Sequence, residues 1–96
     1  MSVLEDEFII ACGKANGEFV NMSDGKLGCY LKEPDAYNEY PEQTQILFDR
    51  DDTAFINSSL EIGNITSFGH RKNSFMIETE HSELYIEYNS IGGKIR

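Results

Sequence analysis

The clearest pattern along the chain is an alternation of apolar and polar positions in its C-terminal half. The segments SFMIET (74–79) and ELYIEY (83–88) place aliphatic, aromatic or β-branched residues at every second position. A period of two is typical of strands with one buried face, and the intervening EHSE has hairpin length. Upstream, EIGNITSF (61–68) indicates another strand, which GHRKN separates from this hairpin. We therefore predict an antiparallel meander here.

The N-terminal third gives a similar signal with one competing interpretation. The dipeptides Asn16-Gly17 and Asp24-Gly25 suit hairpin turns that need positive φ, and they divide EFIIAC, EFVNM and LGCYL into three short strands. However, an N-terminal helix from about residue 2 to 12 also fits. Ser2 and Glu5 have the spacing of a capping box. Leu4, Phe8 and Cys12 repeat at every fourth position, as on one face of a helix. Both interpretations stay open.

The centre of the chain adds one more hairpin and the longest connection. TQILF and TAFIN flank DRDD (49–52), and the stretch KEPDAYNEYPE (32–42) follows the third of the N-terminal strands. Pro34 and Pro41 remove backbone donors there and bias the preceding residues away from helix. Ninety-six residues suffice for one domain. We predict a single all-β domain over residues 1–96, a small antiparallel sandwich or barrel-like meander of about 6–8 short strands.

The charge of the chain narrows the classes of partner. Seventeen acidic residues face eight basic ones, for a formal net charge of −9, and residues 1–60 hold twelve of the acids. Such a chain repels nucleic acid and anionic membrane, because binding phosphates requires clustered Lys and Arg. The two basic clusters, HRK at 70–72 and KIR at 94–96, are short. We therefore expect a basic protein as partner.

The N-terminal sequence and the two cysteines indicate the cellular compartment. The start MSVLEDEF carries acids where a secretory signal has positive charge, and the apolar run FIIAC is too short to span a bilayer. Two cysteines are too few for a disulfide framework. We expect a cytoplasmic protein with reduced, buried thiols and no membrane association.

The residue types that carry enzymatic chemistry do not form a convincing site. DRDD lacks the glycine and glutamate of a calcium loop, since Ala54 and Leu60 stand at those positions. His70 and His81 flank one predicted strand, about 20 Å long, so they cannot share a zinc ion. Both cysteines alternate onto apolar faces, and no glycine-rich phosphate loop is present. We expect no catalysis, no metal and no cofactor.

What remains is an acidic, tyrosine-containing surface. Tyrosine supplies contact area at low entropy cost, and fixed acids steer a basic partner. The predicted partner-binding residues are Glu33, Asp35, Tyr37, Glu39, Tyr40, Glu42, Asp49, Asp51 and Asp52. We expect an inhibitor or immunity protein that occludes the basic groove of a toxin, nuclease or other nucleic-acid-acting enzyme. The alternatives are a face that only keeps the chain soluble and an assembly subunit that pairs through its sheet edges.

Overall fold

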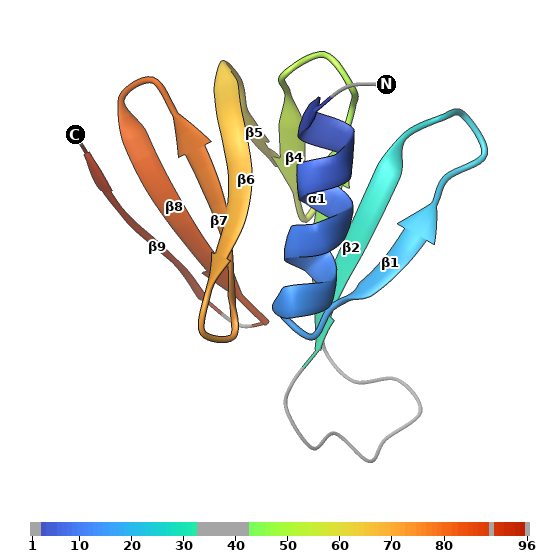
Figure 1. The fold of residues 1–96 in the computed structure, drawn as a ribbon, viewed down its shortest axis with the longest axis horizontal. Helices are drawn as coiled ribbons and strands as arrows, with labels where there is room; N and C mark the ends of the chain where they lie inside the picture. Colours follow the sequence, from blue (N-terminus) through green and yellow to red (C-terminus); the bar gives the residue numbers. More distant parts are fainter. Residues whose placement is uncertain (1–2, 33–42, 89, 96) are drawn as a thin grey trace.

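The computed structural model describes residues 3–32, 43–88 and 90–95, which form one helix and nine strands (Figure 1). Strands β1 to β5 form one antiparallel sheet in sequence order, and β6 to β9 form a second. The predicted antiparallel β architecture is therefore confirmed. The elements are α1 (Val3–Lys14), β1 (Glu18–Asn21), β2 (Leu27–Lys32), β3 (Gln43–Phe48), β4 (Ala54–Ile56), β5 (Leu60–Ile62), β6 (Ile65–Arg71), β7 (Ser74–Thr79), β8 (Ser82–Glu87) and β9 (Ser90–Ile95).

Helix α1 packs against both sheets and closes the core. Figure 1 shows it between β6 on one side and β2 on the other, and its contacts fall on β6, β1, β2 and β7. At the centre of the core, the ring of Phe8 lies 5.2 to 5.7 Å from the rings of Phe48, Phe68 and Phe75. Edge-to-face and offset stacking at these distances is favourable beyond simple burial. The helix thus joins two sheets that share one core.

The N-terminal segment is a helix, so the helical interpretation of residues 2–12 is correct and the strand interpretation is wrong. The buried residues Phe8, Ala11 and Cys12 repeat at helical spacing and face the sheets. Asn16-Gly17 was expected to form a hairpin turn, but it ends the helix instead. Asn16 has φ 60°, its N–H donates to Gly13 O, and Gly17 N–H donates to Cys12 O. This pair of bonds is a Schellman motif.

The two cysteines form a disulfide, which corrects the expectation of reduced thiols. Cys12 in α1 and Cys29 in β2 are bonded, with their Cα atoms 5.8 Å apart. Both side chains are fully buried, as the apolar pattern around them predicted. Their sequence separation of 17 gave no sign of the contact, because only the packing of α1 on the first sheet brings the two side chains together.

Two other differences concern strand boundaries. EIGNITSF was expected to form one strand, but Asn64 has φ 55° and divides it into β5 and β6, which belong to different sheets. Left-handed backbone interrupts a strand, and Asn tolerates it well. The sequence also gave no prediction for β9, since SIGGKI lacks the alternation that marked the other strands. β9 nevertheless pairs with β8 over six residue pairs.

Candidate functional site

The turn between β3 and β4 carries three of the predicted partner-binding acids. Its backbone is tight, with Asp49 N–H donating to Thr53 O and Asp51 N–H donating to Asp49 O, both at 2.9 Å. Arg50 has φ 64°, so the chain reverses sharply at this residue. The predicted hairpin around residues 49–52 is confirmed, and it keeps its carboxylates at one end of the first sheet.

Two other parts of the chain bring further acids to this end. Lys26 Nζ lies 3.6 Å from Asp24 and 3.9 Å from Asp49, which ties the β1–β2 turn to the β3–β4 turn. Arg50 lies 3.8 Å from Glu5 in the first turn of α1. We call this set the acidic end: its members are Glu5, Asp6, Asp24, Asp49, Asp51 and Asp52, with the cations Lys26 and Arg50. Six carboxylates against two cations leave an excess of four negative charges.

The acids that the sequence analysis missed are Glu5, Asp6 and Asp24. A helix beginning near residue 3 places Glu5 and Asp6 in its first turn, where acids interact favourably with the helix dipole. The position of Glu5 next to Arg50 of the β3–β4 turn depends on how α1 packs, which no local pattern reveals. The sequence thus identifies the acidic residues, but it does not show that they lie close together in the fold.

The other six predicted partner-binding residues, Glu33, Asp35, Tyr37, Glu39, Tyr40 and Glu42, lie outside the described residues. Before this segment β2 ends at Lys32, and after it β3 begins at Gln43. Gln43 is at the opposite end of β3 from Asp49. Six strand residues span about 20 Å, so the start of β3 at Gln43 lies about that far from Asp49. The structure groups Asp49, Asp51 and Asp52 in one turn. The predicted binding role of residues 33–42 stays a prediction.

An apolar sheet face adjoins the acidic end. In the first sheet, the residues that alternate with the buried core positions point away from α1 and the second sheet. We call the apolar ones the outer face: Val20, Met22, Tyr30, Leu47 and Phe55, all half-buried. Gly28 lies among them, because a Cβ there would sit 3.7 Å from both the Met22 sulfur and the Tyr30 ring. Gln45 donates to Tyr30 Oη at 3.2 Å on the same face.

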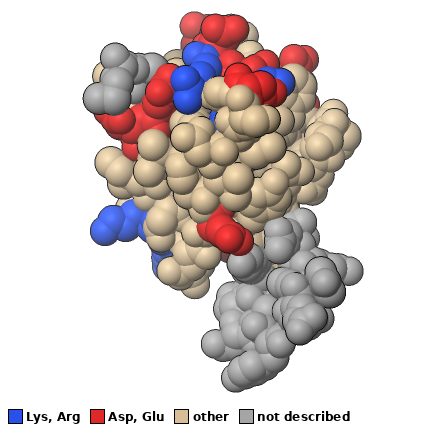
Figure 2. Space-filling view, turned by 90° about the vertical axis from the view of Figure 1, so that its right-hand side faces the viewer, with Lys and Arg blue, Asp and Glu red and all other residues tan. Residues whose placement is uncertain are grey.

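The outer face and the acidic end are continuous along the chain. Met22 precedes Asp24 by two residues, and Leu47 precedes Asp49 by two. Seen from the β1–β2 side, Figure 2 shows charged side chains gathered at one end of the molecule above a broad, mostly uncharged surface. An apolar, aromatic centre with a charged rim is the common anatomy of a protein–protein interface.

The side chains considered for catalysis or metal binding do not assemble into a site. The disulfide leaves neither Cys12 nor Cys29 as a free thiol. His70 lies exposed on β6 rather than in a loop, and the exposed His81 lies 3.8 Å from Glu80. Within residues 3–32, 43–88 and 90–95, no three His, Cys, Asp or Glu side chains converge as metal ligands would.

One residue of each basic cluster, Arg71 and Lys94, lies on the outer surface of the second sheet. The guanidinium of Arg71 lies 5.8 Å from the centre of the Tyr85 ring, a cation–π geometry. Tyr85 Oη donates to Glu83 at 2.6 Å, and Lys94 lies 3.5 Å from the same carboxylate. Because Glu83 stands between the two cations, this surface is a mixed-charge network rather than a phosphate-binding patch.

Comparisons with known proteins supply no further assignment. No family model, no curated protein and no solved structure matches this chain. In the part of the chain that the structure describes, α1 is the single helix, and it is neither long nor apolar enough to cross a membrane.

Proposed function

We propose that this protein is a non-catalytic binding protein that occludes a basic surface of a partner protein. The observation that carries the proposal is the continuity of the acidic end with the apolar outer face. The acids steer a basic partner toward the molecule, and the tyrosine, phenylalanine and aliphatic side chains provide the area that desolvates on contact.

The partner class that fits best is an enzyme that acts on nucleic acid, such as a nuclease or a nuclease toxin. The substrate groove of such an enzyme is lined with Lys and Arg to bind phosphates. An excess of four carboxylates next to an apolar face can fill that groove and exclude the substrate. Occlusion needs no catalytic residue on this chain.

The test begins with affinity capture from an extract of the source cell, washed in parallel at low and at high salt. We expect a basic protein that is retained at low salt and released at high salt, because screening weakens steering between exposed charges. The captured protein is then assayed for nuclease activity with and without this chain. Inhibition at equimolar ratio supports occlusion, whereas full activity in the complex contradicts it.

A pair of charge-reversal variants locates the interface. Asp24→Lys with Asp51→Lys changes two exposed acids of the acidic end, and Glu80→Lys with Glu87→Lys changes two exposed acids of the second sheet. Both variants have the same net charge. We expect the first to slow association by about tenfold or more and the second to have a much smaller effect. Equal association rates for the two variants, measured by stopped flow, would remove the acidic end from the interface.

A further inference from the structure

Strand β9 is the longest uncovered sheet edge among the described elements. It pairs with β8 over six consecutive residue pairs without a register shift. The edges of the first sheet, β1 and β5, are only four and three residues long, and the other edge of the second sheet, β6, packs against α1. A regular edge strand presents unpaired N–H and C=O groups that can accept another strand.

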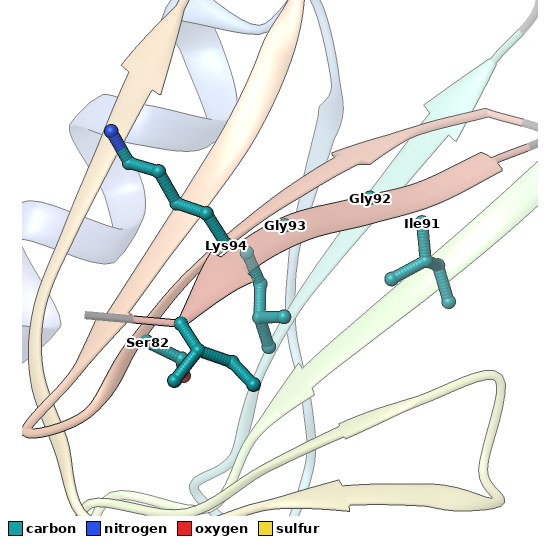
Figure 3. Close-up of a pocket in the computed structure, with 7 residues that line it drawn as sticks. Ser82, Ile91, Gly92, Gly93 and Lys94 are labelled. Atoms are coloured by element: carbon teal, nitrogen blue, oxygen red, sulfur yellow. The ribbon is translucent and has the colours of Figure 1, made fainter.

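The side of β9 that faces the interior carries two isoleucines that the other described residues leave exposed. Ile91 pairs with the fully buried Ile86 and Gly93 pairs with Leu84, yet Ile91 is 44% exposed and Ile95 is 88% exposed. A shallow pocket of about 280 Å³ lies here, lined by Ser82, Leu84 and residues 91–95. Figure 3 shows Ile91 and Lys94 projecting from opposite sides of β9.

We propose that β9 pairs antiparallel with β9 of a second copy, about a twofold axis at Gly93. The sequence Ile91-Gly92-Gly93-Lys94-Ile95 suits this register. Residues equidistant from Gly93 become cross-strand partners, so Ile91 of each copy faces Ile95 of the other on the inner side. Cross-strand apolar pairs stabilise antiparallel sheets, and a twofold interface uses the same patch on both copies. The two four-stranded sheets then form one continuous sheet.

The distribution of charge favours β9 over other surfaces for self-association. In this register Lys94 faces Gly92 rather than the second Lys94, and it is already paired with Glu83 at 3.5 Å. β6, β7 and β8, spaced about 4.8 Å apart, separate β9 from α1 and the acidic end. Two copies of net charge −9 therefore meet at an edge where the two acidic ends are distant and screened at physiological salt, and where the nearby Glu83 is paired with Lys94.

The small contact implies a weak dimer whose population depends on concentration. Sedimentation equilibrium of the full chain over a concentration series tests this directly. We expect a reversible monomer–dimer equilibrium, and a monomer at all concentrations up to high micromolar overturns the proposal. The outcome is independent of the proposed occlusion of a basic partner, because the acidic end and the outer face stay free in this dimer.

A matched pair of substitutions at Gly92 tests the register. A Cβ at Gly92 meets nothing within 4 Å, so both Gly92→Lys and Gly92→Glu fit the monomer. In the proposed register the new side chain faces Lys94 of the other copy, twice per dimer. We expect Gly92→Glu to dimerise at least about tenfold more tightly than Gly92→Lys. General repulsion between acidic chains predicts the reverse order, so equal or reversed affinities overturn the register.

A third variant and its control test the apolar contact. Ile95→Lys removes both Ile91–Ile95 pairs at a position that is 88% exposed, whereas Ile10→Lys changes an isoleucine on α1 that is 60% exposed. We expect the first variant to weaken dimerisation about tenfold or more and the second to leave it unchanged. A dimer weakened by Ile10→Lys and not by Ile95→Lys would place the interface on α1 and overturn the proposal.

Discussion

Gly17 follows the end of α1 at a point where the backbone touches the disulfide. A Cβ on this residue would lie 2.5 Å from Cys29 Sγ and 3.0 Å from Cys12 Sγ. Its N–H also donates to Cys12 O at 2.8 Å and closes the Schellman motif. Neither the disulfide nor the strand behind it can retreat easily, since Cys29 and Leu31 are buried. Only glycine fits this position without moving the core.

We therefore expect Gly17→Ala to destabilise the protein by about 1–3 kcal/mol, the usual cost of forcing an extra group into a packed core. The matched control is Gly13→Ala, because a Cβ at Gly13 meets nothing within 4 Å and the residue lies inside α1. Alanine is favoured over glycine in a helix by about 1 kcal/mol, so the control should be stabilising. Urea denaturation measures the free energy of unfolding, which should fall for Gly17→Ala and rise for Gly13→Ala. A Gly17→Ala variant as stable as the parent chain would contradict the steric requirement for glycine at this position.

At the scale of the element, α1 is held to the first sheet by a covalent bond as well as by packing. The disulfide joins α1 to β2, while Glu7 accepts a hydrogen bond from Phe68 N–H of β6 at 3.2 Å. The helix is thus fixed to both sheets, and its N-terminal turn holds Glu5 near Arg50. The position of the acidic end depends on this docking.

Breaking the disulfide should cost about 3 kcal/mol, the expected effect of closing a loop of this length in the unfolded chain. The double variant Cys12→Ala, Cys29→Ala removes the bond and leaves no reactive thiol. Its free energy of unfolding, compared with that of the oxidised parent, measures the effect. In parallel, iodoacetamide should add no mass to the parent chain unfolded without reductant. Alkylation of both cysteines under those conditions would mean that the thiols are reduced, as the sequence first suggested.

For the whole molecule, the net charge of −9 makes self-repulsion a general term in stability. The described ion pairs are mostly exposed or half-exposed, so each contributes little. Salt screens both the attraction within ion pairs and the repulsion between like charges. Because acids outnumber bases, we expect the repulsion to affect stability more than the attraction does.

We expect the Tm to rise as NaCl increases from about 0.01 to 0.15 M, a change that shortens the Debye length from about 30 to 8 Å. Differential scanning calorimetry at fixed pH measures the shift. The control is the doubly substituted Asp24→Lys, Asp51→Lys chain, in which a lower net charge should reduce the salt effect. A Tm that falls with salt in the parent chain would show that the ion pairs at the acidic end outweigh the repulsion.

The sequence by itself determined the strands whose side chains alternate and the turns that close them. SFMIET and ELYIEY became β7 and β8, and DRDD became the tip of the β3–β4 hairpin. These features are local, because one buried face imposes a period of two and a tight turn requires particular residues. The charge excess is likewise a property of composition alone.

Tertiary structure decided the features that depend on residues far apart in the chain. Residues 2–12 satisfied both a strand and a helix pattern, and a helix results because its apolar residues can then fill the space between two sheets. The same docking brings Cys12 to Cys29 and Glu5 to Arg50. The strand β9 has no alternating pattern and exists through its pairing with β8. Local sequence records which backbone shapes are accessible, whereas burial and pairing energies, which arise between distant segments, select among them.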